Sequence, residues 1–254
     1  MHEDWTRWMA VWRRNALVWR KSSRTALLGG FAEPLCYLLA LGYGIGSIVD
    51  EIEGLSYLGF LAAGILSTSA MNAATFEGLY LAYTRMEVLR TWDGMLTAPL
   101  GIADVILGEV IWMAAKSTLN AGLILLVTAL MGLTTHWTAL WVLPVAFLAG
   151  LCFGGMALMV TSFARSYDFF VYYVTLVITP MALLSGVFFP NTAMPESLRF
   201  GMACLPLSHI VLSIRTLLVN SGDWSITWHL LVPSLYATGS IFIAILSFQR
   251  RLLR

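Results

Sequence analysis

Residues 24–53 read R-T-A-L-L-G-G-F-A-E-P-L-C-Y-L-L-A-L-G-Y-G-I-G-S-I-V-D-E-I-E. The apolar run Leu27–Val49 within it is long enough for a membrane span, since about 20 apolar residues cross a hydrocarbon core ~30 Å thick. Only acids follow the run, whereas six basic residues precede it: Arg7, Arg13, Arg14, Arg20, Lys21 and Arg24. Basic residues beside a span are retained in the cytoplasm. The stretch therefore predicts a membrane protein with a cytoplasmic N-terminus.

The composition excludes a conventional soluble enzyme. Hydrophobic residues make up 59% of the 254 residues and charged residues 11%, with a mean hydropathy of +0.78, whereas a soluble domain is about 25% charged. Nucleic acid is not an expected partner, because the basic residues lie beside spans and the net charge is only +1. The first apolar run is too long for the h-region of a cleavable signal peptide.

Six segments are long and apolar enough to span a membrane. They are Leu27–Val49, Tyr57–Leu79, Val105–Met131, Leu140–Phe163, Phe169–Phe189 and His229–Phe248. We therefore expect an all-α polytopic membrane protein in which residues 1–254 form a single transmembrane domain. Its parts are an interface helix (1–26), a six-span bundle (27–248) and a cytoplasmic tail (249–254).

The distribution of basic residues supports this topology. The segments predicted to be cytoplasmic are 1–26, 80–104, 164–168 and 249–254, and they hold twelve of the fifteen Lys and Arg residues. Arg199 and Arg215 fall in the long outer connection 190–228, where the charge rule is weaker, and Lys116 falls inside a span. Both termini are thus predicted to be cytoplasmic.

The N-terminal segment is predicted to form an amphipathic helix of its own. Its aromatic face holds Trp5, Trp8, Met9, Trp12, Ala16 and Trp19, flanked by Arg13 and Arg20, and Arg7, Arg14 and Lys21 lie on the opposite face. A basic, tryptophan-lined helix lies in the plane of the membrane interface. The helix is either a simple anchor or also a docking site for a cytoplasmic partner, and the sequence leaves both open.

Four ionisable residues fall in or beside the predicted spans: Glu33, Glu77, Glu109 and Lys116. A charge in the bilayer costs several kcal/mol unless it is paired or hydrated, so each is a candidate functional residue. Glu109 and Lys116 share one helical face about 10 Å apart, which is too far for direct pairing. The plainer interpretation places the glutamates at the inner boundary in contact with water. Lys116 lies deeper, which favours an internal role.

The stretch 83–103 predicts a short cytoplasmic helix over Arg85–Asp93, ended by Gly94 and Pro99. Apolar residues recur in it at intervals of three or four, namely Met86, Leu89, Trp92, Met95 and Leu96. An exposed apolar ridge of this kind is suited to contact with another protein. The same period also fits a helix that lies flat on the bilayer.

The outer connection 190–228 is interrupted by Pro190, Pro195 and Pro206, which break helices. The intervening segments Leu198–Leu205 and Leu207–Val219 are apolar enough to form short helices at, or partly within, the outer interface. Irregular backbone at membrane depth is tolerated where it lines a wet cavity, so this region predicts a pathway exit or a lid.

Motifs for covalent chemistry and metal binding are missing from the sequence. Lys21 and Lys116 each precede a serine but lack the glycines of a phosphate-binding loop. Ser185–Gly186 with His209 is the nearest approach to an intramembrane hydrolase, and the glycine before the serine is absent. Cys36, Cys152 and Cys204 predict no disulfide framework or zinc site. His209 is expected to be an interfacial hydrogen-bonding group, because no second ligand stands at metal spacing.

Residues 183–218, L-L-S-G-V-F-F-P-N-T-A-M-P-E-S-L-R-F-G-M-A-C-L-P-L-S-H-I-V-L-S-I-R-T-L-L, resemble the signature region of type-2 ABC exporter permeases. That signature has S-G-x-F-F-P, then a proline before a short interfacial helix, then P-L-x-H and an arginine. Residues 31–46 and 90–109 resemble the nodulation-type branch of the family, which exports lipo-oligosaccharides. The resemblance covers essentially the whole chain.

The resemblance implies a permease subunit of the bacterial inner membrane that exports an amphiphilic glycolipid, lipo-oligosaccharide or polysaccharide. A second copy of the chain and separate ATPase subunits, which bind the ATP and magnesium, complete the transporter. This chain then has no cofactor and no catalytic residue. Alternatives are a drug or lipid efflux permease of the same family, or an ion-driven carrier or channel using Glu33, Glu109 and Lys116.

The resemblance also assigns candidate functional residues. The coupling helix after the second span, which contacts the ATPase together with the N-terminal helix, would use Arg85, Met86, Leu89, Arg90, Trp92 and Asp93. The interface helix would present Trp5, Trp8, Trp12, Arg13, Arg14 and Trp19. The outer re-entrant region would comprise Ser185, Gly186, Pro190, Pro206, His209 and Arg215.

Overall fold

The computed structural model describes residues 6–49, 51–52, 54–134, 136–190, 194–219 and 226–252. Trp5 of the predicted interface helix, the acids Asp50 and Glu53 after the first predicted span, and Arg254 of the predicted tail lie outside the described residues. The elements are α1 (Trp8–Gly46), β1 (Glu51–Ile52), β2 (Leu55–Ser56), α2 (Tyr57–Phe76), π-helical turns η1 (Glu77–Ala82) and η2 (Thr84–Val88), α3 (Thr91–Leu96), α4 (Ile102–Leu130), a 3-10 turn η3 (Trp137–Trp141), α5 (Val142–Phe163), α6 (Asp168–Tyr173), η4 (Val174–Ile178), α7 (Thr179–Leu184), α8 (Glu196–Cys204), α9 (Pro206–Val219) and α10 (Ile226–Leu252). The predicted all-α class is confirmed, since the two strands form only a short hairpin.

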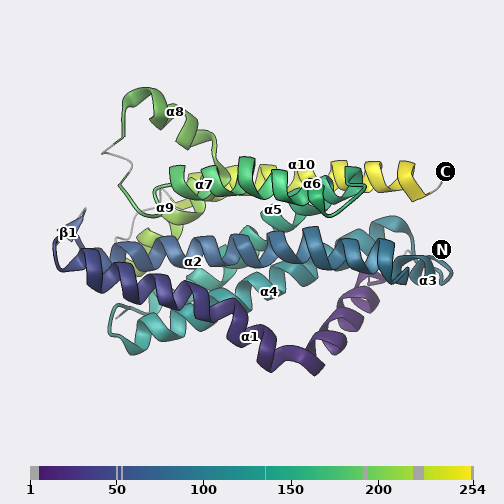
Figure 1. Cartoon of the computed structure of the whole chain (residues 1–254), viewed down its shortest axis with the longest axis horizontal. Helices are drawn as coiled ribbons and strands as arrows, with labels where there is room; N and C mark the ends of the chain where they lie inside the picture. The colour runs from purple at the N-terminus through teal and green to yellow at the C-terminus, as the bar shows by residue number, and fades with distance from the viewer. Residues whose placement is uncertain are drawn as a thin grey trace.

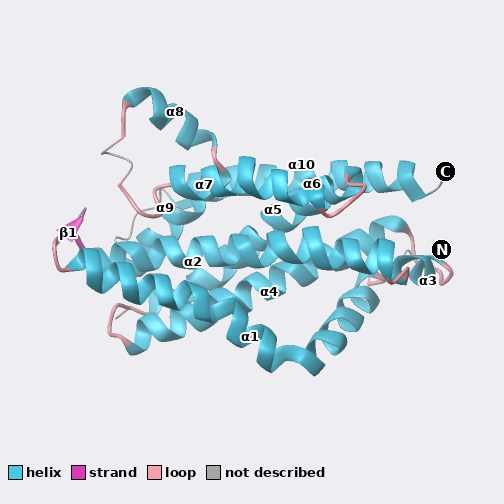
Figure 2. Cartoon of the chain, in the orientation of Figure 1, coloured by secondary structure: helices cyan, strands magenta, loops and turns pink. Residues whose placement is uncertain are grey.

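The long helices run side by side along the longest axis of the molecule (Figure 1). Helix α5 is central, because it packs against α2, α4 and α10. The end of the bundle that carries α3 also carries both ends of the chain, and the hairpin lies at the opposite end. We call these the α3 end and the hairpin end. Figure 2 shows that the segments running from one end to the other are almost entirely helical.

Glycines let the helices approach closely. A Cβ on Gly150 of α5 would lie 2.4 Å from the Cα of Ala114 on α4, and one on Gly108 of α4 would lie 2.5 Å from the Cβ of Val11 on α1. Small residues at such crossings are typical of helix packing in membranes, where van der Waals contact replaces the hydrophobic effect as the driving force.

The expectation of a separate N-terminal helix is wrong. Residues 8–46 form one hydrogen-bonded helix, α1, which bends sharply so that its N-terminal arm angles away from the part that runs along the bundle (Figure 1). The arm does not present all of its tryptophans to the interface either. Val11 and Asn15 are buried, and the Trp19 ring packs edge-on against Trp112 of α4 at 5.9 Å. Tertiary packing on α4 thus determines the orientation of the arm.

Four helices of the described chain are long and apolar enough to cross a membrane: Tyr57–Val88, Ile102–Leu130, Trp137–Phe163 and Ile226–Leu252. A fifth counts if the bent pair α8–α9 is one span. The segment predicted as the fifth span is shorter than expected, since its helix covers Asp168–Leu184. The structure thus confirms a polytopic helical membrane protein without confirming six spans.

The predicted cytoplasmic helix Arg85–Asp93 is also wrong. Helix α2 continues through η1 and η2 to Val88, and the chain then breaks at Arg90, whose φ of 50° is left-handed. A new short helix, α3, begins at Thr91. The predicted ridge is divided accordingly: Met86 and Trp92 are buried, while Leu89 is 61% exposed.

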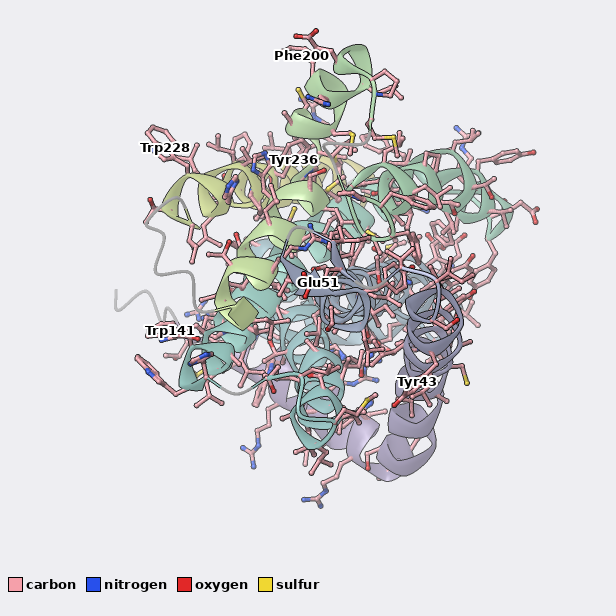
Figure 3. All side chains as sticks on the ribbon, turned by 90° about the vertical axis from the view of Figure 1, so that its left-hand side faces the viewer. Tyr43, Glu51, Trp141, Phe200, Trp228 and Tyr236 are labelled. Carbon is pink, nitrogen blue, oxygen red and sulfur yellow. The ribbon has the colours of Figure 1, made fainter. Side chains whose placement is uncertain are left out.

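The two short helices predicted in the outer connection are confirmed. They are α8 and α9, which meet at Pro206 with an angle of 83° between them. Helix α8 stands away from the bundle at the hairpin end (Figure 1). Figure 3 looks at this end and shows Trp141, Phe200 and Trp228 at its edge, pointing outward. All three side chains are more than half exposed, as expected for aromatic residues at a membrane interface.

Candidate functional site

Two glutamates are buried between α2 and α4. Glu77 stands where α2 passes into its first π-helical turns, and Glu109 lies on the second turn of α4. Their exposed fractions are 3% and 0%. The interpretation that they sit in water at the inner boundary is therefore wrong, and the cost of burying two carboxylates has to be met by partners inside the protein.

Arg85 bridges the two carboxylates. Its Nε and Nη2 donate to Oε1 and Oε2 of Glu109 at 3.0 and 2.5 Å, and its Nη1 donates to Oε1 of Glu77 at 2.8 Å. The contact with Glu109 is bidentate, the geometry in which arginine binds a carboxylate most strongly. The π-helical turns between Glu77 and Arg85 change the rotation of the helix, and in this structure both side chains face α4.

Lys116 and two tryptophans complete the network. Lys116 Nζ donates to Oε2 of Glu77 at 2.6 Å, and Trp112 Nε1 donates to Oε1 of the same carboxylate at 3.0 Å. Trp92 Nε1 donates to Oε1 of Glu109 at 3.3 Å. The absence of a direct Glu109–Lys116 pair agrees with their separation along α4. Two carboxylates and two cations balance, and every carboxylate oxygen has a donor, so the cluster meets the conditions under which buried ions are tolerated.

The network joins the chain break after Val88 to the rest of the bundle. Trp92, on α3, reaches Glu109 and also packs edge-on against Phe248 of α10 at 5.1 Å. Arg14 of the α1 arm, which was predicted to lie on the face opposite the tryptophans, is half-buried at the edge of the network. Burial and the nearby Arg85 guanidinium lower the pKa of Arg14. Helices α1, α2, α3, α4 and α10 thus meet around one set of charges.

A cavity of about 680 Å³ opens beside the network. Glu77 and Lys116 form part of its wall, so the network faces the cavity on one side. Most of the remaining wall is apolar, and polar and aromatic side chains are set into it: Glu33, Tyr37, Thr68, Ser69, Asn72, Phe76, Tyr80, Asn120 and Thr179. The elements that surround it are α1, α2, α4 and the segment η4–α7. Such a wall offers hydrogen bonds and apolar contact together, as an amphiphile requires.

Two polar groups of the cavity wall have no hydrogen-bond partner within the described part of the chain. They are the Ser69 hydroxyl, on a residue with an exposed fraction of 4%, and the indole N–H of Trp19. Buried polar atoms are normally satisfied, and an exception calls for an explanation. Both atoms are covered by surrounding protein atoms, so they do not open onto the cavity themselves.

Comparison with known proteins identifies the family. The model of the ABC-2 type transporter family matches residues 6–219. The chain belongs to the ABC-2 type transporter family. The chain is similar to "Nodulation protein J" of Bradyrhizobium diazoefficiens, with 44% identity over 247 residues that cover 97% of this chain and 94% of the relative. It is also similar to "Nodulation protein J" of Rhizobium meliloti, with 41% identity over 246 residues that cover 97% of this chain and 94% of the relative. "Inner membrane transport permease YadH" of Escherichia coli is 21% identical over 249 residues, which cover 98% of this chain and 93% of the relative.

The residues expected to couple an ABC-2 permease to its ATPase separate into two groups. Arg85, Met86 and Trp92 point into the bundle, where Arg85 and Trp92 hold the charge network. Leu89, Arg90 and Asp93 are exposed at the α3 end. Periodicity alone could not separate them, because the left-handed break at Arg90 changes the direction of the helix.

The residues of the outer re-entrant region fall into two clusters. Arg215 is buried, its Nη2 donates to the Gly186 carbonyl at 2.9 Å, and its guanidinium lies 3.7 Å from the Phe60 ring centroid. Ser185 donates to the Met181 carbonyl at 2.5 Å, so its hydroxyl is engaged within its own helix. His209 is hydrogen-bonded, in keeping with the role expected for it: its Nδ1 lies 2.9 Å from Nδ1 of His229 and its Nε2 lies 2.8 Å from the Ala203 carbonyl oxygen.

Several site residues were missed by sequence reasoning. Trp112 and the amides of Asn72 and Asn120 had no charge to attract attention inside apolar runs. A usable signal was present for Trp112, since Glu109, Trp112 and Lys116 recur at intervals of three and four on one face of α4. Glu33, by contrast, was singled out and does line the cavity.

Replacement of Arg85 by methionine should be strongly destabilising. It leaves Glu109 and Glu77 without their shared cation, and removal of one partner from a buried ion pair costs about 3–5 kcal/mol. We expect a lower midpoint of thermal unfolding for Arg85→Met, measured by far-ultraviolet circular dichroism in detergent. Adding Glu109→Gln to Arg85→Met should restore part of the loss, because the amide carries no charge.

Arg90→Met provides the matched control. Arg90 pairs with Asp93 at 3.4 Å, but their side chains are 71% and 53% exposed, and exposed pairs contribute about 0–1 kcal/mol. Its unfolding midpoint should stay close to that of the unaltered chain. Equal shifts in Arg85→Met and Arg90→Met would show that the network does not stabilise the bundle.

Proposed function

We propose that this ABC-2 transporter family member is the permease of an ATP-driven exporter, and that its cargo is a lipo-oligosaccharide or a similar amphiphilic glycolipid. The observation that carries this proposal is the cavity beside the charge network. Its amides, hydroxyls and carboxylates suit the many hydroxyls of a sugar chain, and its aromatic residues suit apolar faces and acyl groups. The similarity to "Nodulation protein J" over nearly the full chain supports the same cargo class.

We further propose that the chain crosses the bacterial inner membrane six times with both termini cytoplasmic. In this arrangement α1 supplies the first span and α6–α7 the fifth. The α3 end then lies in the cytoplasm and the hairpin end outside. The count of basic residues supports this orientation, since twelve of fifteen fall in the four segments placed inside.

The exposed turn Val88–Asp93 would be the contact with a cytoplasmic ATPase subunit, which would bind the ATP and magnesium. Val88 and Leu89 are each 61% exposed, and they stand directly beside residues that hold the network. Movement of this turn would act on Trp92, Arg85 and then Glu77 and Lys116 at the cavity wall. A second copy of the chain would complete the pathway.

The orientation can be tested with the native cysteines. Cys204 is exposed at the end of α8, whereas Cys36 lies within the first proposed span. A membrane-impermeant maleimide should label intact spheroplasts at Cys204, and Cys204→Ser should abolish the label, because thiols react as thiolates in water. Adding Ser166→Cys to Cys204→Ser should give labelling only after the membrane is permeabilised. Labelling of that variant in intact spheroplasts would contradict the proposed topology.

Leu89→Asp should uncouple the permease from its ATPase without disturbing the fold. A carboxylate forced into an apolar contact loses its hydration, so we expect the ATPase subunit to bind at least about tenfold more weakly. ATPase stimulation in a co-reconstituted complex is the measurement. Leu198→Asp, an exposed leucine on α8 at the other end, is the control and should leave stimulation unchanged. Full stimulation by Leu89→Asp would move the contact elsewhere.

The double variant Asn72→Leu/Asn120→Leu should slow transport. Each amide lost from the cavity wall removes a hydrogen bond worth about 1 kcal/mol, so export should fall about tenfold or more. ATP-dependent movement of a fluorescent lipo-oligosaccharide in proteoliposomes is the measurement. Thr118→Val is the control, because its hydroxyl bonds to Ala114 of the same helix. Transport that continues without ATP under an ion gradient would favour the carrier alternative.

A further inference from the structure

A second groove lies at the α3 end, between the C-terminal ends of α5 and α10. It encloses about 760 Å³ and does not share a lining residue with the cavity described above. Three arginines line it (Arg165, Arg250 and Arg251), together with two serines and three apolar residues, and none of the described residues that line it is acidic. The α10 residues that line it lie in the C-terminal half of that helix: Ile243, Leu246, Ser247, Arg250 and Arg251.

The guanidinium of Arg251 is already paired with groups of the bundle. Its Nη1 donates to the carbonyls of Thr161 and Ser162 at 3.0 and 2.9 Å, and its Nη2 donates to Glu87 at 2.7 Å. The two carbonyls belong to the last turn of α5, which carries the negative end of the helix dipole. Arg251 therefore forms a fixed, neutralised side of the groove.

Arg165 and Arg250 are different. Both side chains are exposed, and neither has a hydrogen-bond or ion-pair partner in the part of the chain that the structure describes. Arg165, in the loop after α5, and Arg250, on α10, thus present uncompensated positive charge to one groove. Ser247 adds a hydroxyl donor on the α10 side.

The wall of the groove toward the middle of the bundle is apolar. Phe163, Ile243 and Leu246 line it and are 61%, 43% and 39% exposed. Both helices belong to the set that is long and apolar enough to cross a membrane. A basic pocket between two such helices, with apolar residues on its membrane side, matches the shape of a phospholipid: phosphate at the boundary and acyl chains beside the helices.

We propose that this groove binds the headgroup phosphate of an anionic phospholipid of the inner leaflet, through Arg165 and Arg250. The acyl chains would lie along Phe163, Ile243 and Leu246. The location in the inner leaflet rests on the orientation in the proposed function, whereas binding itself requires only that α5 and α10 span the bilayer. The groove is separate from the cargo cavity, so the lipid is a structural ligand rather than cargo.

Native mass spectrometry of the purified chain with phosphatidylglycerol or phosphatidylcholine of the same acyl chains tests the proposal. The chain should retain phosphatidylglycerol in preference to phosphatidylcholine. Each arginine near a membrane surface changes lipid affinity about fivefold, so Arg165→Gln/Arg250→Gln should weaken retention of phosphatidylglycerol roughly 25-fold. Phosphatidylcholine retention should not change. Equal retention of the two lipids by the unaltered chain would overturn the proposal.

Arg90→Gln is the control, because it removes an exposed arginine at the α3 end without touching the groove or the α1 arm. It should retain phosphatidylglycerol within about twofold of the unaltered chain. An equal loss in the control would assign the effect to general surface charge. Millimolar inorganic phosphate should not displace the lipid; displacement would mean that the groove takes phosphate itself. Neither measurement needs cargo or ATPase, so a failure here leaves the transport proposal intact.

Discussion

The bridge from Arg85 to Glu77 and Glu109 is the interaction on which the arrangement of the bundle near its α3 end depends. An isolated carboxylate transferred from water to an apolar interior is so costly that it would take up a proton instead. In this structure one guanidinium serves both carboxylates, with Lys116, Trp92 and Trp112 supplying the remaining donors. The separation of α2 and α4 at this level is therefore set by hydrogen-bond geometry as well as by packing.

The same bridge explains why the helix after Phe76 is irregular. Continuous α-helix from Tyr57 to Val88 would place later side chains at different angles around the axis than the two π-helical turns do. Such turns are frequent at functional sites, and here they occupy the interval between two members of the network. The left-handed, strained conformation of Arg90 comes just after these turns, between Val88 and the start of α3 at Thr91. It reverses the chain so that Trp92 can return to Glu109.

Hydrophobic length predicted four of the six expected spans, α2, α4, α5 and α10. These succeeded because the constraint is local: a segment either has enough apolar residues to cross a membrane or does not. Sequence reasoning failed where burial depends on partners far along the chain. Arg85 was placed on an exposed surface because its partner Glu109 is 24 residues away, on another helix. Trp92 was assigned to a docking ridge for the same reason. Glu33 and Lys116 were identified as candidates because a charge in an apolar run is visible without a partner.

Arg215 is a second buried arginine that contacts α2, near the end of the helix opposite Arg85. Its guanidinium lies over Phe60 and donates to Gly186, the left-handed residue that follows α7. Phe60 and Glu77 are 17 residues apart on one helix, a distance of about 25 Å at 1.5 Å per residue. That is close to the thickness of a hydrocarbon core, about 30 Å. Each end of α2 is therefore linked by a buried arginine to a place where a helix is interrupted: Arg85 before the break at Arg90, and Arg215 at Gly186 after α7. The cavity lies between the two arginines along α2. Because guanidinium groups stay charged and need several acceptors, we expect each arginine to hold its interruption of the helix in place and to couple it to the wall of the cavity.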